Sequence, residues 1–78
     1  MAAKSTKPNK TMAALKLAEP FRYIYGIAGM NYFIKKDTGE EYVRIFMPDG
    51  NDFDVNVTAD SCSALVTDVV RELNRRLM

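Results

Sequence analysis

Residues 52–77, DFDVNVTADSCSALVTDVVRELNRRL, hold the two most regular patterns in the chain and decide which kind of fold it forms. Phe53, Val55 and Val57 alternate with acidic residues and Asn, which is the period of a strand with one buried face. Over Asp60–Leu77 the apolar residues return every three or four positions, which predicts an amphipathic helix. A strand leading into such a helix predicts a sheet with this helix packed across one face.

The predicted C-terminal helix has a continuous apolar stripe and a polar side. Thr58 or Asp60 would cap its start, and the basic residues near its end suit the helix dipole. Arg71 and Arg75 fall on its polar side, whereas Cys62 falls on the stripe and is interpreted as a core residue. The stripe consists of Cys62, Leu65, Val66, Val69, Leu73 and Leu77.

Upstream of this region the sequence predicts three more strands. Turn residues separate them, and Gly39 suits the left-handed position of a tight hairpin. The predicted strands are Phe21–Ile27, Asn31–Lys36 and Glu41–Met47, and the predicted turns are Asp37–Glu40 and Pro48–Asn51. With the strand at 52–57, they predict an antiparallel meander of about four strands.

The N-terminal part predicts a basic arm and a short helix. Residues 1–10 carry three lysines among Ser, Thr, Pro and Asn, and we expect a flexible arm because they offer little to bury. Residues 11–19 are strong helix formers that Pro20 would stop, with Asn9 or Thr11 as cap. This helix would need Met12, Leu15 and Leu17 to dock on the body. We therefore predict a single α+β domain over residues 11–78, its four-stranded antiparallel sheet covered on one face by the C-terminal helix.

Composition excludes several classes of function. The chain has 78 residues, no His, no Trp and one Cys. Without His, neither a Ser–His or Cys–His catalytic pair nor a Cys/His zinc site can form. No glycine-rich phosphate loop is present, and Asp52, Asp54 and Asn56 match only the first half of a calcium loop, with Val57 where Gly is required. We therefore expect a non-enzymatic protein without a cofactor or a metal.

The sequence also predicts where the protein resides. A single cysteine cannot form an internal disulfide, and the N-terminus lacks the apolar core of a signal peptide. No apolar stretch approaches the roughly 18 residues that a spanning helix needs. We expect a cytoplasmic protein that does not interact with membranes.

One helix covers only one face of a sheet, so the other face is the candidate binding surface. In the strand at 41–47, Tyr42, Arg44 and Phe46 would face outward if the alternate residues pack under the helix. The neighbouring strand would add either Phe33 and Lys35 or Tyr32, Ile34 and Lys36, and Arg22, Arg71 and Arg75 complete the candidate partner-binding set. Aromatic and basic side chains on a sheet suit a partner protein, a homodimer or single-stranded nucleic acid, but they are also ordinary strand residues.

Charge is segregated along the chain although its sum is only +1. Residues 1–36 carry seven Lys/Arg and one acid, whereas residues 37–68 carry eight acids and one Arg. Either the folded protein presents two electrostatic faces, or the signs mix again as the strands interleave. The acidic middle of the chain weakens its overall attraction for nucleic acid.

One resemblance supports the nucleic-acid alternative. Strands followed by Asp52-Phe-Asp-Val-Asn-Val-Thr-Ala-Asp60 and an amphipathic helix resemble the PC4 (whirly-type) single-stranded DNA-binding coactivators over residues 20–77. This resemblance implies a four-stranded sheet, one helix, a dimer and a Ser/Lys-rich N-terminal tail. The basic strands of that family are poorly matched, because the corresponding region here is acidic.

Two hypotheses follow from the sequence. The first is a small non-enzymatic regulator or inhibitor that binds a larger protein, of the kind that phages and mobile elements direct at host defence or transcription. The second is a dimeric single-stranded nucleic-acid-binding domain. We favour the first because of the acidic middle third and the low net charge.

Overall fold

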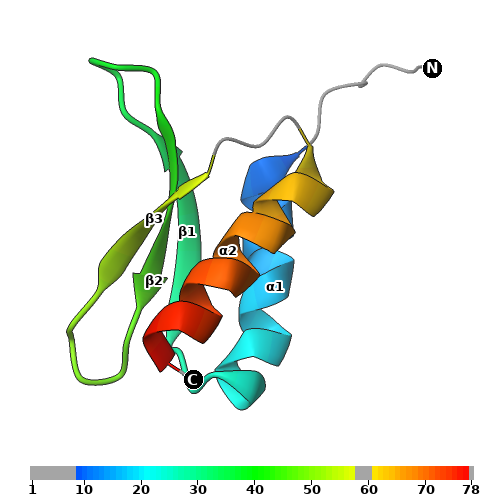
Figure 1. Cartoon of the computed structure of the whole chain (residues 1–78), viewed down its shortest axis with the longest axis vertical. Helices are drawn as coiled ribbons and strands as arrows, with labels where there is room; N and C mark the ends of the chain where they lie inside the picture. The colour runs from blue at the N-terminus through cyan, green and yellow to red at the C-terminus, as the bar shows by residue number, and fades with distance from the viewer. Residues whose placement is uncertain (1–8, 58–60, 78) are drawn as a thin grey trace.

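The computed structural model describes residues 9–57 and 61–77, which form two helices and a three-stranded sheet (Figure 1). The order along the chain is α1 (Lys10–Ile24), β1 (Gly29–Ile34), β2 (Glu41–Phe46), β3 (Phe53–Val57) and α2 (Cys62–Leu77). The strands are antiparallel and adjacent in the order β1-β2-β3. The predicted α+β class is therefore confirmed.

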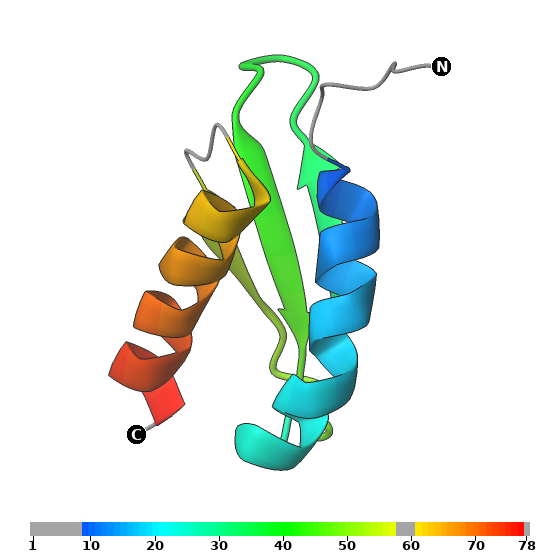
Figure 2. The same ribbon diagram turned by 90° about the vertical axis from the view of Figure 1, so that its right-hand side faces the viewer.

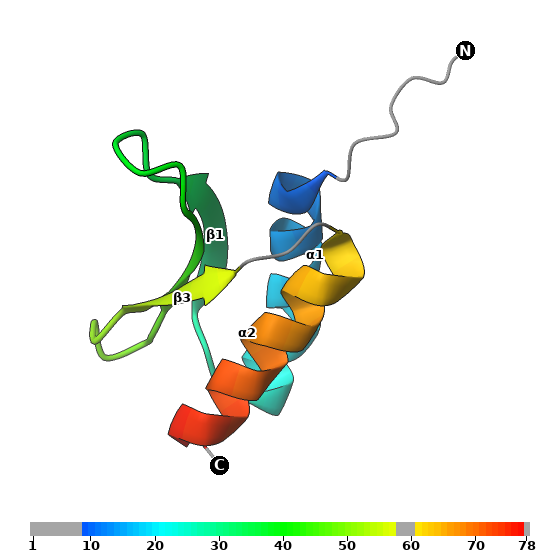
Figure 3. The same ribbon diagram turned by 45° about the horizontal axis from the view of Figure 1, so that its top comes forward.

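Both helices lie on the same side of the sheet, so the molecule has two layers (Figures 1 and 3). α1 packs mainly on β1 and α2 on β3, as the view turned by 90° shows (Figure 2). No described element lies on the other face of the sheet. The prediction that one face stays without a helix is confirmed, although two helices rather than one cover the inner face.

The predicted strand at Phe21–Ile27 is wrong, and the sheet has three strands instead of about four. α1 continues through Pro20 to Ile24, although proline cannot donate the helical hydrogen bond to the carbonyl of Lys16. Phe21 is 8% exposed and lies in the core, and Tyr25 packs beside it. Burial of this face offsets the lost hydrogen bond, whereas a strand here would turn Tyr23, which is exposed, toward the core together with Phe21 and Tyr25.

The docking face predicted for the first helix is wrong for Met12 and Leu15 and confirmed for Leu17. Met12 and Leu15 are exposed, whereas the helix buries Ala14 and Phe21 and packs Leu17 against the core. The apolar residues lie on two sides of α1, and only the tertiary contacts decide which side is buried.

Local signals explain where the helices begin and end. The Asn9 side chain accepts a hydrogen bond from the Met12 amide at 2.9 Å, which confirms the predicted cap. Gly26, with φ of +73°, follows the last turn of α1 in the left-handed region that favours glycine. At the start of α2, the Ser61 hydroxyl accepts from the Ala64 amide at 3.2 Å. The predicted caps Thr58 and Asp60 lie outside the described residues.

Two hairpins set the register of the sheet. β1 begins at Gly29, two residues earlier than predicted. It also ends two residues earlier, because Lys35 and Lys36 belong to the first hairpin loop. The Lys35 amide closes this loop on the Glu40 carbonyl at 2.9 Å, and Gly39 has the predicted left-handed backbone with φ of +77°. The second hairpin turns at residues 47–50 and places Arg44 opposite Asp54.

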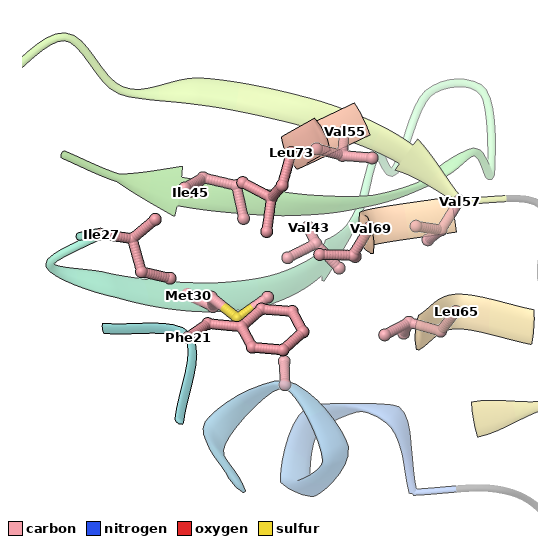
Figure 4. Close-up of a cluster of buried hydrophobic side chains, with 11 residues drawn as sticks. Phe21, Ile27, Met30, Val43, Ile45, Val55, Val57, Leu65, Val69 and Leu73 are labelled. Carbon is pink, nitrogen blue, oxygen red and sulfur yellow. The ribbon is translucent and has the colours of Figure 1, made fainter. Parts of the chain in front are cut away.

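The core lies between the sheet and the two helices (Figure 4). Each strand contributes alternate residues to it, and α2 contributes Leu65, Val69 and Leu73 from the predicted stripe. Cys62 and Val66 are half-buried, and Leu77 is exposed. The buried residues are Ala14, Phe21, Ile27, Met30, Val43, Ile45, Val55, Val57, Leu65, Val69 and Leu73.

Candidate functional site

The face of the sheet opposite the helices carries the aromatic and basic side chains that the sequence singles out. Strand register places Phe33 directly opposite Tyr42, and alternation puts Lys35 and Arg44 on the same side. Of the two alternatives for the neighbouring strand, the structure selects Phe33 with Lys35. We call this surface the outer sheet face; it consists of Asn31, Phe33, Lys35, Tyr42, Arg44, Phe46, Asp54 and Asn56.

The centre of the outer sheet face is a stacked pair of rings with a cation against each. The ring centroids of Phe33 and Tyr42 are 5.7 Å apart and the planes differ by 17°. The Lys35 ammonium lies 4.8 Å from the Tyr42 centroid, and the Arg44 guanidinium carbon lies 5.1 Å from that of Phe33. The four side chains contact one another through stacking and cation–π interactions, which favour this arrangement over other rotamers.

Arg44 also pairs with the neighbouring strand. Its Nε and Nη2 donate to the two carboxylate oxygens of Asp54 at 2.8 and 3.2 Å. These hydrogen bonds and the positive charge of Arg44 lower the pKa of the Asp54 carboxyl below its ordinary value. The carboxylate neutralises the charge of Arg44, so the outer sheet face has mixed sign rather than a basic one.

Phe46 extends the apolar part of this face toward the start of β1. It pairs with Gly29, and a Cβ on that glycine would lie 3.7 Å from the Phe46 ring. The Phe46 ring therefore covers the backbone of Gly29, which has no side chain of its own, while 37% of the Phe46 surface stays exposed.

The structure does not bring the remaining predicted binding residues to this face. Lys36 lies in the first hairpin loop. Arg22 is on α1, and Arg71 and Arg75 are on α2, which belong to the layer behind the sheet (Figure 3). Arg71 lies 3.6 Å from Asp68, and Arg75 pairs with Glu72, so both arginines have an acidic neighbour on their own helix.

The acidic residues near the second hairpin have structural partners. Asp49 accepts hydrogen bonds from the backbone and side chain of Asn51, both at 3.0 Å. Asp52 accepts from the Met47 amide at 2.8 Å, and Asp54 binds Arg44. No cluster of three or more metal-ligating side chains occurs within residues 9–57 and 61–77.

A second polar cluster ties α1 to the inner side of the sheet. Glu41 Oε1 accepts from Lys10 Nζ at 2.5 Å and from the Tyr32 hydroxyl at 2.9 Å. Hydrogen bonds from Lys10 and Tyr32 lower the pKa of Glu41, whereas burial and the bond to Glu41 raise that of Tyr32 to about 12. Lys10, which the sequence places in the arm, is thus the first residue of α1 and anchors it; residues 1–8 of the predicted arm lie outside the described residues.

Sequence reasoning missed two features of the surface. The pairing of Arg44 with Asp54 depends on the register between β2 and β3, which alternation alone does not give. The exposed apolar side of α1 was missed because Met12 and Leu15 were assigned to the core. Helical periodicity carried through Pro20 to Tyr23 would have indicated a second stripe.

No protein-family model, curated protein or solved structure matches this chain. The four-stranded, one-helix fold that the PC4 resemblance implies is not the fold observed, because three strands stand between two helices. None of the helices that the structure describes is both long and apolar enough to cross a bilayer.

Proposed function

We propose that this domain is a small non-enzymatic regulator or inhibitor in the cytoplasm, and that its outer sheet face occupies a site on a larger partner protein. The observation that carries the proposal is the stack of Phe33 and Tyr42 held between Lys35 and Arg44 on the face that no described helix covers. Tyr, Phe and Arg are enriched at protein interfaces, and Tyr and Arg are frequent anchors there. Because the stacking and cation–π contacts favour one arrangement of these side chains, less conformational entropy would be lost on binding.

The same geometry argues against the nucleic-acid alternative. A base that stacked on Phe33 or Tyr42 would compete with the second ring and with the cation already against it. Arg44 would have to leave Asp54 to grip a phosphate, and the Asp54 carboxylate would then repel that phosphate. Single-stranded nucleic acid remains the second candidate because it binds sheets that carry aromatic and basic side chains, but the Asp54 carboxylate opposes it.

The test compares two matched double variants. Arg44→Ala with Phe46→Ala removes a cation and an apolar side chain from the outer sheet face. Arg71→Ala with Leu77→Ala removes the same kinds of side chain from α2, which lies in the other layer. Each immobilised protein captures material from nuclease-treated lysate of its source cell, and each is titrated with a fluorescent oligo-dT strand at low salt.

We expect the wild type and the α2 variant to retain the same protein. The outer-face variant should bind it about tenfold or more weakly, as the loss of interface anchors implies. Capture of no protein by the folded wild type would overturn the proposal, and so would capture that the outer-face variant leaves unchanged. Oligo-dT binding that the outer-face variant abolishes would establish the nucleic-acid function instead.

A further inference from the structure

Helix α1 has a second apolar face on the side away from the core. The buried side consists of Ala14, Phe21 and their neighbours. On the opposite side, Met12, Leu15 and Tyr23 are 45%, 55% and 84% exposed. Positions 12, 15, 19 and 23 recur every three or four residues, so with Glu19 these side chains form one stripe along the helix.

The solvent side of α2 shows that this stripe is not an ordinary exposed helix face. α2 presents Ser63, Thr67, Arg71 and Arg75 to solvent, and Leu77 at its end is the only large apolar residue exposed on it. α1 instead exposes a Met, a Leu and a Tyr along its whole length. Exposed apolar groups that line up in this way mark an interaction surface.

The charges beside the stripe also lack partners in the described part of the chain. Five other cations, Lys10, Arg44, Arg71, Arg75 and Arg76, form ion pairs there, whereas Arg22, Lys35 and Lys36 do not. Lys16 and Glu19 form none among residues 9–57 and 61–77. The face therefore offers Lys16 and Glu19 together with three apolar side chains, and the exposed Arg22 lies at its edge, seven residues after Leu15.

We propose that this face, formed by Met12, Leu15, Lys16, Glu19 and Tyr23, binds the same face of a second copy of the chain. Suppose that two α1 helices lie antiparallel with the twofold axis midway between residues 17 and 18. Two residues then face each other across the axis when their residue numbers add up to 35. Met12 then faces Tyr23 of the copy, and Lys16 faces Glu19. The stripe is self-complementary in this register: a thioether meets an aromatic ring, and each charge meets its opposite, twice over.

The size of the contact predicts a weak dimer. A helix of 15 residues packed on its copy buries less than the roughly 1,200 Å² of stable complexes, which places the dimer among transient ones. The stripe points away from the core and hence from the sheet, so both outer sheet faces stay accessible. Such a dimer would present two copies of the proposed partner-binding surface and bind a multivalent target with higher avidity.

Sedimentation equilibrium across protein concentrations, with charge-swap variants, tests the proposal. Lys16→Glu and Glu19→Lys each place like charges opposite one another, and we expect each to raise the dimer dissociation constant about tenfold or more. The double variant Lys16→Glu with Glu19→Lys restores opposite charges and should return the constant to near that of the wild type. Lys36→Glu changes net charge equally in the hairpin loop and should leave the constant unchanged.

A cross-link supplies a second measurement that does not depend on these variants. Zero-length carbodiimide coupling of an equal mixture of unlabelled and ¹⁵N-labelled protein should give mixed-isotope peptides joining Lys16 to Glu19. A wild type that stays monomeric up to about 1 mM, the range of the weakest specific complexes, would overturn the proposal. So would a dimer that the single charge reversals do not weaken. Loss of the dimer on Phe46→Ala would also overturn it, because the contact would then lie on the sheet.

Discussion

At the scale of the residue, Tyr32 shows how the fold changes the chemistry of a side chain. Burial, the hydrogen bond to Glu41 and the negative charge of that carboxylate together raise the pKa of the phenol from 10.0 to about 12. The sequence offers no sign of this, because Tyr32 and Glu41 come together only through the first hairpin and Lys10 only through the packing of α1.

The raised pKa of Tyr32 predicts a loss of stability at high pH. Between pH 10 and 12 the unfolded tyrosine releases its proton while the folded one keeps it, so the unfolded state is favoured. This stabilisation is complete below pH 10 and is lost as the pH rises through about 12. We expect the free energy of unfolding to fall by about 1 kcal/mol per pH unit more in the wild type than in Tyr32→Phe.

Urea denaturation at pH 9 and 11 measures this difference, and ultraviolet titration follows the tyrosinates directly. The tyrosinate signal that appears as the pH approaches about 12 should be missing from the Tyr32→Phe variant. Parallel pH profiles for the wild type and Tyr32→Phe would contradict the prediction.

At the scale of the element, α1 illustrates tertiary packing overriding a local signal. Pro20 favours a helix end, and the alternation after it favours a strand, yet the helix continues to Ile24. Phe21 and Tyr25 are four residues apart, and their rings meet edge to face with centroids 5.3 Å apart. A helix brings side chains four residues apart into contact, whereas a strand would separate these two rings and place Tyr23 between them on the same face.

If packing holds α1 together against the preference of proline, then Pro20→Ala should stabilise the domain. The substitution restores a backbone donor for the Lys16 carbonyl and removes a ring that clashes with it, with an expected gain of about 1–3 kcal/mol. Urea denaturation followed by circular dichroism measures the change. Pro48→Ala is the matched control, because Pro48 lies in a turn, where proline is favourable; it should cost up to about 1 kcal/mol. An unstable Pro20→Ala variant would show that proline sets the course of α1.

At the scale of the whole molecule, both helices share one thin core with one face of the sheet. Leu65 of α2 is fully buried between the layers, whereas Leu15 of α1 is 55% exposed. A domain this small gains only about 3–5 kcal/mol from its core, so each buried side chain accounts for a large part of its stability.

The same substitution at these two leucines should therefore have very different results. Leu65→Ala leaves a cavity and costs about 2–5 kcal/mol, enough to unfold much of the protein at 25 °C. Leu15→Ala, measured at low micromolar concentration where the monomer prevails, should change stability by no more than about 0.5 kcal/mol. Urea midpoints and one-dimensional proton spectra distinguish the two, and similar midpoints would mean that α1 packs on its other face.

Much of the fold follows from the sequence by itself. Alternation and helical periodicity determine β2, β3 and α2 nearly to the residue, because each pattern fits only one kind of element. Asn9 and Gly39 mark a cap and a left-handed turn through their own chemistry. The same alternation places Tyr42, Arg44 and Phe46 on one face and leaves it free of the C-terminal helix.

Tertiary structure decided the rest. Groups far away in the chain decide three features of the structure. They determine whether residues 21–24 form a strand or a helix, which side of α1 is buried, and which acid pairs with Arg44. Local propensities of ordinary residues differ by about 1 kcal/mol or less, and a proline inside a helix costs about 3 kcal/mol. Burial of one large side chain contributes about 1.5–3 kcal/mol, and the helical course of residues 20–25 packs Phe21 into the core and Tyr25 against it. Where a local pattern and the core compete for the same residues, as they do around Pro20, the core therefore prevails.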